Sequence, residues 1–357
     1  MNRDKTAIVL DFLNGQLKEL KQGDRLPSTR QIQEACGVSQ AVVTRALDEL
    51  QALNLIEAKP QSGYYKTDRK ISTVHIVFLG KTERAIFEQT SFYYENLSRI
   101  IMGLSSKGFS VNFHVVNELD ELPFYPLHSK KQQRLGRFPD SLIVTFRLRY
   151  SQLVQVALME EHGFKFIHWL PDFIEPCPNS IRIDDKKLIR AQIELLCRKG
   201  HRRIAYIHRR DPEIWHRADN IRYEEFCHEV IEKQLQVSPE YLVYFNLYAH
   251  DQKYCDEQIE HLFSLKTPPT ALLLTNDNIG KNVFLSLQKC SVFPGRDVAV
   301  LGTNNHTFCQ FMMPELSSVG FDLDAGVNYL QNQASSSGHM AGDTWYLPLC
   351  IAERETT

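Results

Sequence analysis

Side chains that can hydrogen-bond to a base pair gather just after Gly37. The amide of Gln40 can donate and accept at once, which matches the paired groups that adenine presents in the major groove of DNA. Thr44 lies four residues later, on the same face of a potential helix. Arg30 and Arg45 can reach phosphates or bases nearby. The residues predicted to contact DNA in this group are Arg30, Ser39, Gln40, Ala41, Val42, Thr44 and Arg45.

The surrounding pattern is typical of two short helices joined by a turn. Pro27 and Ser28 can begin the first helix, whose inward residues would be Ile32 and Ala35. A turn at 37–39 then supplies the N-cap of the second helix, which such a motif places across a major groove. The inward residues of the second helix recur every three or four positions and are Val43, Ala46, Leu47, Leu50 and Leu53.

Further elements flank this motif. Apolar side chains at helical spacing from Ile8 to Leu20 predict a first helix that ends near residues 22–23. Residues 55–58 and 64–66 predict two short strands, and their hairpin would form a wing. On this wing Lys59 can contact a phosphate, and Gly63 allows close approach of the backbone to DNA. We assign residues 1–67 to a DNA-binding domain and 68–72 to a linker.

Residues 23–65, GDRLPSTRQIQEACGVSQAVVTRALDELQALNLIEAKPQSGYY, resemble the winged helix-turn-helix of GntR-type regulators. Those proteins usually carry Arg where this chain has Gln40 and Thr where it has Val42. Because Gln suits adenine and Val can only contact a thymine methyl, we expect an operator half-site shifted towards A and T. The usual Gly-x-Gly of the wing is Gln61-Ser62-Gly63 here. The alternative is that Gln40 and Thr44 only solvate an exposed helix face.

Length and charge limit how the chain can bind DNA. Its 357 residues, 43% hydrophobic, can bury more than one core and suggest two or three domains. The net charge is −2, so affinity for nucleic acid must come from a local surface. Residues 1–70 hold 11 Lys and Arg against 9 Asp and Glu, an excess of two. This small excess favours a homodimer that adds two modest contacts.

Cysteine spacing and hydropathy bear on the compartment. The eight cysteines form no CxxC or other metal-binding cluster, and no N-terminal signal sequence precedes the motif. We therefore expect reduced thiols in the cytoplasm, with no bound metal and no cofactor. No apolar run approaches the roughly 20 residues that cross a bilayer, so no membrane association is predicted.

From residue 73 onward, buried strands alternate with amphipathic helices such as 186–199 and 278–289. This pattern predicts an α/β domain with two lobes, each built on a doubly wound parallel sheet. The lobes are expected at about 73–177 plus 306–333 and at 178–305 plus 334–357. Residues 117–138 are expected to form an irregular surface excursion. The strands are expected at 75–79, 111–116, 141–146, 164–170, 203–208, 241–245, 271–276 and 297–302.

Most of 73–357 resembles the effector-binding domain of LacI-type regulators, which shares the fold of periplasmic sugar-binding proteins. The resemblance is carried by IRIDDKKLIRAQIELLCRKGHRRIAYIH at 181–208, PPTALLLTNDNIG at 268–280, FPGRDVAVLGTNNH at 293–306 and PELSSVGFD at 314–322. The final LPLCIAERETT resembles the closing strand of that family. Fusion of a GntR-type reader to such a sensor is known in bacterial sugar regulators.

The resemblance also implies an effector site. The family's Arg four residues before an aromatic matches Arg222 and Phe226. Its partner is an Asp in a Gly-aromatic-Asp turn, which here ends in Asn304. Losing that carboxylate would leave Arg222 less neutralised, so we expect a ligand with its own negative charge or carbonyl. Further arginines at or just past strand ends support that expectation: Arg147, Arg149, Arg209 and Arg210.

Other effector-site residues follow buried strands. The resemblance assigns Asn276 to the pocket, and Asp277 belongs either there or at a helix N-cap. His201 is expected in a turn and Asp184 at a cap. Aromatic side chains can stack on a sugar ring or fill the core, and Trp215 is the preferred stacking residue. The aromatic candidates are Trp215, Phe146, Trp169, Tyr93, Tyr94 and Tyr248.

Three functions compete. The favoured one is a transcription factor, expected to be a repressor, that binds double-stranded operator DNA under control of a sugar-like small molecule. A small-molecule-binding protein with a vestigial DNA-binding head is the second. An enzyme is the third, because GntR-type readers are also fused to aminotransferase-like domains. The sequence has no nucleophile elbow, Gly-rich phosphate loop or metal-spaced His cluster, so we predict no enzymatic activity.

Overall fold

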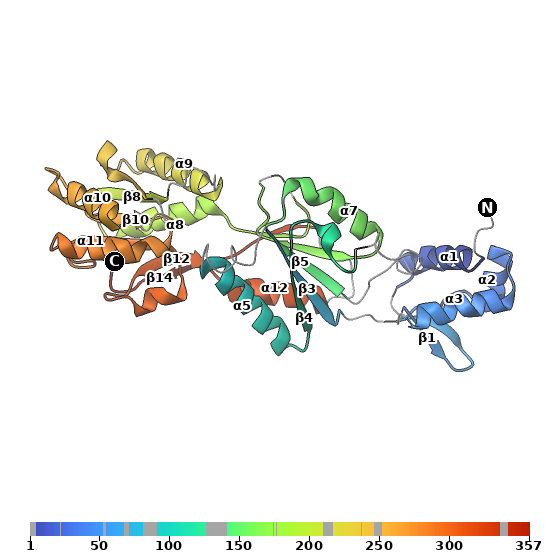
Figure 1. Ribbon diagram of the computed structural model, residues 1–357. Helices are drawn as coiled ribbons and strands as arrows, with labels where there is room; N and C mark the ends of the chain where they lie inside the picture. Colours follow the sequence, from blue (N-terminus) through green and yellow to red (C-terminus); the bar gives the residue numbers. More distant parts are fainter. Residues whose placement is uncertain are drawn as a thin grey trace. The chain divides into compact units, whose positions relative to one another are not determined.

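The N-terminal head is a winged helix-turn-helix in the computed structural model (Figure 1). The structure describes residues 5–21, 23–52, 55–67, 71–80, 91–125, 141–173, 175, 177–209, 217–236, 238–245, 252–335 and 342–357. The head contains α1 (Lys5–Glu19), α2 (Thr29–Cys36), α3 (Gln40–Ala52), β1 (Ile56–Lys59) and β2 (Gly63–Lys66). The predicted helices and strands of the head are therefore present.

Apolar side chains from all three helices and the wing form one core in the head. Ile32 of α2 and Val43, Ala46, Leu47 and Leu50 of α3 are fully or almost fully buried, as their helical spacing predicted. Leu53 lies outside the described residues. The prediction for Ala35 was wrong. It is exposed, and its neighbour Cys36 packs against the core instead, because the short α2 turns its inner face through residues 32 and 36.

A capping box begins α2. The Ser28 hydroxyl accepts a hydrogen bond from the Gln31 amide at 3.3 Å, and the Gln31 side chain accepts one from the Ser28 amide at 2.8 Å. Gly37 ends the helix in the left-handed conformation, at φ 64°. Ser28→Ala is expected to destabilise α2 by about 1 kcal/mol, because an N-terminal amide loses its partner. Faster hydrogen exchange of the α2 amides in the full-length chain would show this, and unchanged exchange would contradict it.

Contacts divide the chain into two compact units, the first of which includes the head. The first unit comprises Met1–Ala85, Ile100–Ile181 and Val327–Trp345, and the second comprises Ile86–Arg99, Arg182–Gly326 and Tyr346–Thr357. Each unit contains a six-stranded sheet among the described residues. The strand orders are β13-β7-β6-β5-β3-β4 and β14-β12-β11-β10-β8-β9. Both orders place the first strand of the unit inside its sheet, as in doubly wound folds.

The first sheet contains β3 (Thr73–Leu79), β4 (Ser110–Val116), β5 (Ser141–Phe146), β6 (Lys165–Trp169), β7 (Ser180–Arg182) and β13 (Thr344–Tyr346). Strands β3 to β7 pair in parallel. The associated helices are α5 (Ser91–Ser106), η1 (Leu119–Glu121), η3 (Tyr150–Gln152), α7 (Leu153–Glu161) and α12 (Leu323–Ser335). One face of the sheet packs a buried cluster that includes Val77, Ile143 and Phe166.

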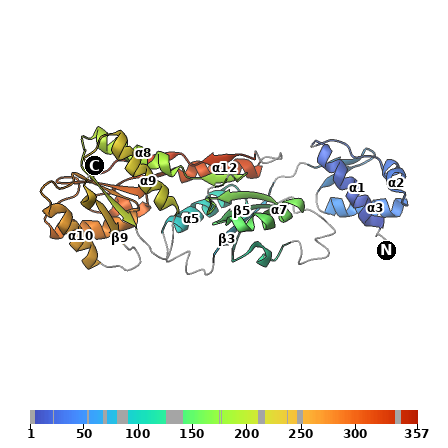
Figure 2. The ribbon, with the colours of Figure 1, turned by 90° about the horizontal axis from the view of Figure 1, so that it is seen from above.

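The second sheet contains β8 (Ile204–Arg209), β9 (Leu242–Phe245), β10 (Ala271–Leu274), β11 (Ala299–Asn304), β12 (Ser317–Phe321) and β14 (Leu349–Ala352). Strands β8 to β12 pair in parallel, and β14 is antiparallel to β12. The helices are α8 (Asp185–Arg198), α9 (Arg217–Glu232), η4 (Pro239–Tyr241), α10 (Gln252–Ser264), η5 (Asp277–Ile279), α11 (Gly280–Lys289) and η6 (Thr307–Phe311). Figure 2 shows α8 and α9 on one side of this sheet and α10 on the other.

Two expectations for this region were wrong. Residues 306–333 were expected in the first lobe, but β12 pairs with β11 in the second sheet. Residues 334–357 were expected in the second lobe, but β13 lies in the first sheet. The expected excursion at 117–138 begins as part of the core. Leu119, Leu122 and Tyr125 are buried there, because their apolar side chains cover the sheet face beside β4. Residues 126–138 lie outside the described residues. No described helix is long and apolar enough to cross a membrane.

A histidine pair joins β3 to β4. His75 Nδ1 and His114 Nε2 are 3.0 Å apart, and His75 also packs against Phe124. Burial, together with the neighbouring His114, lowers the pKa of His75 to about 4. Because this folded-state pKa lies below the ordinary value of 6.5, the associated stability is complete above pH 6.5 and is lost as the pH falls towards 4.

Acidification should therefore lower the thermal midpoint of the full-length chain between pH 6.5 and 5. His75→Phe keeps a ring against Phe124 but cannot take up a proton, so its midpoint is expected to fall less over this interval. Thermal unfolding of both proteins by circular dichroism makes the comparison. Equal declines would show that this pair does not determine the pH dependence.

Candidate DNA-binding surface and effector site

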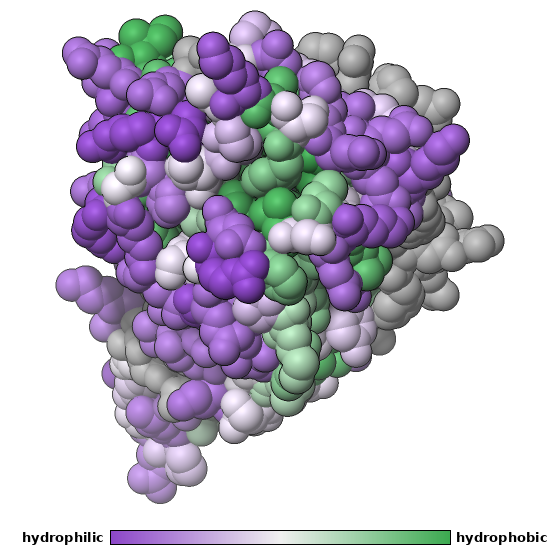
Figure 3. All heavy atoms as spheres, turned by 90° about the vertical axis from the view of Figure 1, so that its left-hand side faces the viewer, coloured by the Kyte–Doolittle hydropathy of each residue, from purple (hydrophilic) through white to green (hydrophobic). Residues whose placement is uncertain are grey.

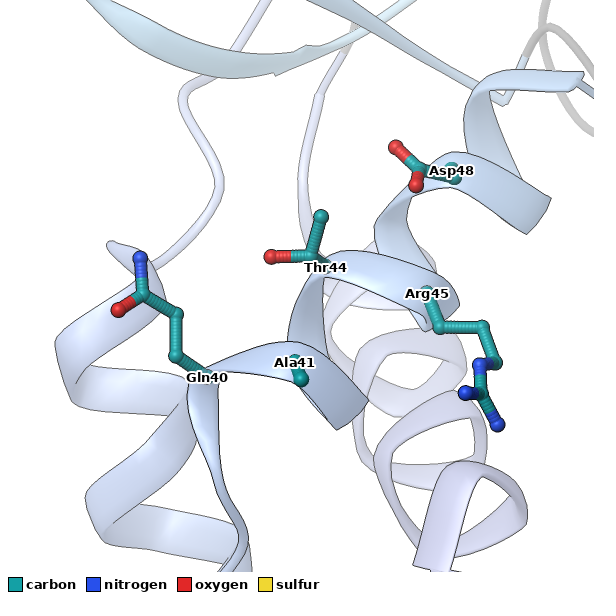
Figure 4. A pocket seen from close by; sticks show the side chains of 5 residues that line it. All are labelled: Gln40, Ala41, Thr44, Arg45 and Asp48. Carbon is teal, nitrogen blue, oxygen red and sulfur yellow. The ribbon is translucent and has the colours of Figure 1, made fainter.

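The N-terminal half of α3 presents an exposed polar face. Gln40, Ala41, Thr44 and Arg45 are exposed, whereas Val42 is half-buried and packs against the head core. The four exposed residues line a shallow hollow with Asp48, which was not among the predicted DNA-contacting residues. Figure 4 shows Gln40, Thr44 and Asp48 along one side of α3, while Arg45 points away from them. Their spacing of four residues was the signal that would have included Asp48.

This face has the chemistry needed for base recognition. A Gln amide can bond to adenine, and an Asp carboxylate can accept a hydrogen bond from the amino group of cytosine. Ser39 is exposed just before α3, and its carbonyl accepts hydrogen bonds from the Val42 and Val43 amides.

Two of the predicted DNA-contacting cations already have partners. Arg30 Nε lies 3.1 Å from Glu34 Oε1 across one turn of α2, and both side chains are exposed. Lys59 Nζ lies 3.1 Å from Glu57 Oε1 and 4.5 Å from the centre of the Tyr65 ring. Exposed pairs of this kind are weak, so both cations can exchange their carboxylate for a phosphate.

The wing retains its turn although it has lost one glycine. Gln61 adopts a left-handed conformation at φ 60°, and Gly63 has φ 107°. Residues Ile56 to Lys59 then pair in register with Lys66 to Gly63. A left-handed Gln is less favourable than Gly but is tolerated in a tight turn. The replacement of the usual glycine by Gln61 therefore leaves a closed hairpin.

In the second unit, Arg222 is buried and already paired. Its Nε lies 2.6 Å from Asp185 Oδ1, and its Nη1 donates to the Thr275 carbonyl at 3.2 Å. Burial disfavours the charged guanidinium, but Asp185 and Asp219 hold the pKa of Arg222 above its ordinary value. The expectation that Arg222 is poorly neutralised was therefore wrong. Asp185, next to the cap residue Asp184, supplies the carboxylate that Asn304 does not.

The strand ends around Arg222 carry further polar groups. Asn276 follows β10 and caps η5, and its Oδ1 accepts a hydrogen bond from the Asn278 amide at 2.9 Å. Asn304 ends β11, half-buried and at φ 94°. Arg222, Thr275 and Asn276 thus lie together at the carboxyl edge of the second sheet, where open α/β sheets bind ligands.

Asp277 has a different role from either one predicted. It is completely buried, and its two carboxylate oxygens accept hydrogen bonds from the His306 amide and the Ser318 hydroxyl, each at 2.8 Å. Burial raises the pKa of Asp277. The N-cap of η5 is Asn276, and Asp277 instead joins η5 to the segments that follow β11 and form β12. Asp184 does cap α8, as predicted, through the Lys187 amide at 2.9 Å.

The aromatic candidates separate into buried and accessible groups. Phe146 and Trp169 are fully buried in the core of the first unit. The Phe146 ring centre lies 6.3 Å from that of Phe78 and 6.0 Å from that of Trp169, on neighbouring strands in register. Arg147 follows β5, half-buried and at φ 56°. On α5, Tyr93 is half-buried and Tyr94 is exposed. Trp215 and Tyr248 lie outside the described residues.

Comparisons with known proteins agree with this two-part organisation. Residues 16–65 match the family of bacterial regulatory proteins, gntR family, and residues 193–329 match the periplasmic binding protein-like domain. The HTH-type transcriptional regulator GanR of Bacillus subtilis (strain 168) is 22% identical over 311 residues, which cover 84% of this chain and 88% of GanR. The chain is a helix-turn-helix transcriptional regulator.

Solved structures show which fold the regulator's second part has. A CelR–cellobiose complex superposes with a TM-score of 0.56 at 18% identity, covering 90% of this chain and 92% of CelR. A LacI family transcriptional regulator from Lactobacillus casei with bound glucose gives a TM-score of 0.55 at 18% identity, covering 80% of this chain and 100% of that chain. The regulator therefore combines a GntR-type head with a periplasmic binding protein-like domain that shares its fold with these solved regulators.

Proposed function

We propose that this regulator is a cytoplasmic, non-enzymatic repressor that binds a two-fold symmetric operator as a homodimer and responds to a neutral sugar or sugar derivative. The exposed face of α3 is the observation that carries the DNA-binding part. Gln40, Thr44 and Arg45 stand on a helix whose opposite side is fixed by buried Val43, Leu47 and Leu50. A rigid helix with a polar outer face is what recognition in the major groove requires.

The ligand class is supported by the charge balance around Arg222. Its guanidinium is neutralised by half-buried Asp185, and the nearby polar groups of Asn276 and Asn304 are uncharged amides. An anionic ligand would compete with Asp185 for the guanidinium, whereas hydroxyl groups can bond to amides and to the remaining guanidinium N–H groups. CelR and the Lactobacillus casei regulator were solved with cellobiose and glucose, both neutral sugars.

The dimer is supported by apolar side chains exposed in the second unit. Leu285 of α11 is 51% exposed, and Phe311 and Met313, at and after η6, are 74% and 94% exposed. The two segments are neighbours, since Lys281 of α11 lies over the Phe308 ring of η6. Figure 3 shows apolar residues gathered in a band on an otherwise mostly hydrophilic face. Exposed apolar patches of this kind mark protein interfaces.

Titration calorimetry with the full-length protein tests the ligand class. Neutral mono- and disaccharides are compared with the uronate and phosphate derivative of each, and every ligand that binds is then added to a protein–DNA complex. We expect a neutral sugar to bind more tightly than its charged counterparts and to change the affinity for DNA. Asn304→Asp adds a carboxylate and is expected to widen the difference between a neutral sugar and its uronate. Tighter binding of the uronate or phosphate would contradict the proposed ligand class.

A further inference from the structure

Arg25 is an exposed cation beside the wing, and its side chain has no ion-pair or hydrogen-bond partner among the described residues. Arg30 is paired with Glu34, and Lys59 is paired with Glu57. Lys66 donates to the carbonyls of Leu17 and Leu20 at the end of α1. The exposed guanidinium of Arg25 is therefore a positive charge still available to an external group.

The backbone holds Arg25 firmly beside the wing. Arg25 forms an isolated antiparallel bridge with Tyr65, so its segment adds a short third strand next to β2. The Leu26 amide donates to the Tyr64 carbonyl at 2.8 Å, and the Lys66 amide donates to the Asp24 carbonyl at 2.9 Å. Two hydrogen bonds thus bracket Arg25 and fix the starting point of its side chain.

The side chain itself lies over the wing glycine. A Cβ added to Gly63 would lie 3.3 Å from Arg25 Nε and 3.4 Å from its Nη2. Gly63 stands at the end of β2 that adjoins the hairpin turn. The Arg25 guanidinium therefore lies near the tip of the wing. Because Gly63 has no side chain, the guanidinium can occupy the space above it.

We propose that Arg25 binds a phosphate of the operator backbone beside the wing and so adds to the positive charge of Arg45, the one cation of α3, where Gln40 is neutral and Asp48 is acidic. This inference rests on the proposed DNA-binding function. A planar guanidinium suits a phosphate, and a cation fixed at the wing would set the position of the head on the duplex without reading its sequence. The contact is therefore expected to be equal on specific and non-specific DNA.

The salt dependence of DNA binding tests this proposal. Full-length wild type and Arg25→Gln are titrated with a mixed-sequence duplex at several salt concentrations by fluorescence anisotropy. Loss of one phosphate contact per head should reduce the slope of log K against log salt by about one per head and weaken binding roughly fivefold or more. Arg25→Lys retains the charge and is expected to keep most of the slope. Lys253→Gln removes one charge from α10, where Lys253 is 86% exposed, and serves as the matched control.

Each outcome has a distinct meaning. An Arg25→Gln slope equal to that of wild type or of Lys253→Gln would overturn the phosphate contact while leaving the regulator function intact. A loss confined to the selected operator, with the mixed-sequence duplex unaffected, would also overturn it, since it would indicate base recognition. Absence of any DNA binding by wild type would contradict the proposed function itself. Hydrogen exchange of the wing amides should be unchanged in Arg25→Gln, because the bracketing backbone bonds remain.

Discussion

Replacing Gln40 and Thr44 together by alanine is expected to weaken specific operator binding by about 100-fold, because each head of a dimer would lose about 1.4 kcal/mol of base contacts. Binding to mixed-sequence DNA should change little, since phosphate contacts supply most of that affinity. Both side chains are exposed on α3, so the fold of the head should be retained. Anisotropy titrations with the selected operator and a shuffled duplex measure the two effects separately.

Gln51 provides a matched control for this prediction. It is also an exposed glutamine of α3, but it lies at the C-terminal end of the helix, three turns from Gln40. Gln51→Ala is expected to bind the operator within about twofold of wild type. Equal losses in the two variants, or a loss on both duplexes for the double variant, would show that the N-terminal face of α3 does not read bases.

The second large effect is expected at Asp277. Asp277→Ala should lower the free energy of unfolding by about 3 kcal/mol, because it leaves the buried His306 amide without its acceptor and opens a cavity. The Ser318 hydroxyl and the Cys309 thiol would also lose the carboxylate. Asp324→Ala is the control, since Asp324 is an exposed carboxylate in a surface pair with Arg99 and should change stability by less than about 1 kcal/mol.

Gly302 sharpens this test. A Cβ at Gly302 would lie 2.0 Å from Asp277 Oδ1, so Gly302→Ala is expected to destabilise the chain by about 1–3 kcal/mol through overpacking. In Asp277→Ala the crowding oxygen is absent, and the double variant should be more stable than the sum of the single effects predicts. Urea unfolding of the four proteins measures this coupling. Additive effects would mean that Gly302 is required for another reason.

Local patterns were sufficient to predict most elements of the fold. Apolar patterns indicate which side of an element is buried. Examples are the helical spacing of Val43, Ala46, Leu47 and Leu50 and the continuous apolar runs of β5 and β10. The assignment of β12 to a lobe was wrong. A continuous apolar run indicates that a strand is covered on both faces, but it does not indicate which sheet the strand joins. The chain passes between the two units after residues 85, 99, 181, 326 and 345, and no composition change marks those points.

The candidate site was less predictable than the fold. Arg222 was selected because it and Phe226 match the pair that the family resemblance implies. Its pairing with Asp185 joins α9 to α8 and could not be predicted from either helix alone. Asp277 was misassigned because the loop position after β10 did not reveal its burial by His306 and Ser318. Arg25 was not selected at all, since its importance depends on the space above Gly63, which is set by the pairing of three chain segments.

Selection of bound sequences from random duplex DNA tests the central claim most directly. Purified full-length protein is used at moderate salt, first without ligand and then with pooled neutral sugars. We expect recovery of a two-fold symmetric site enriched in A and T where Gln40 approaches the bases. Failure to enrich any sequence under either condition would contradict a sequence-specific regulator.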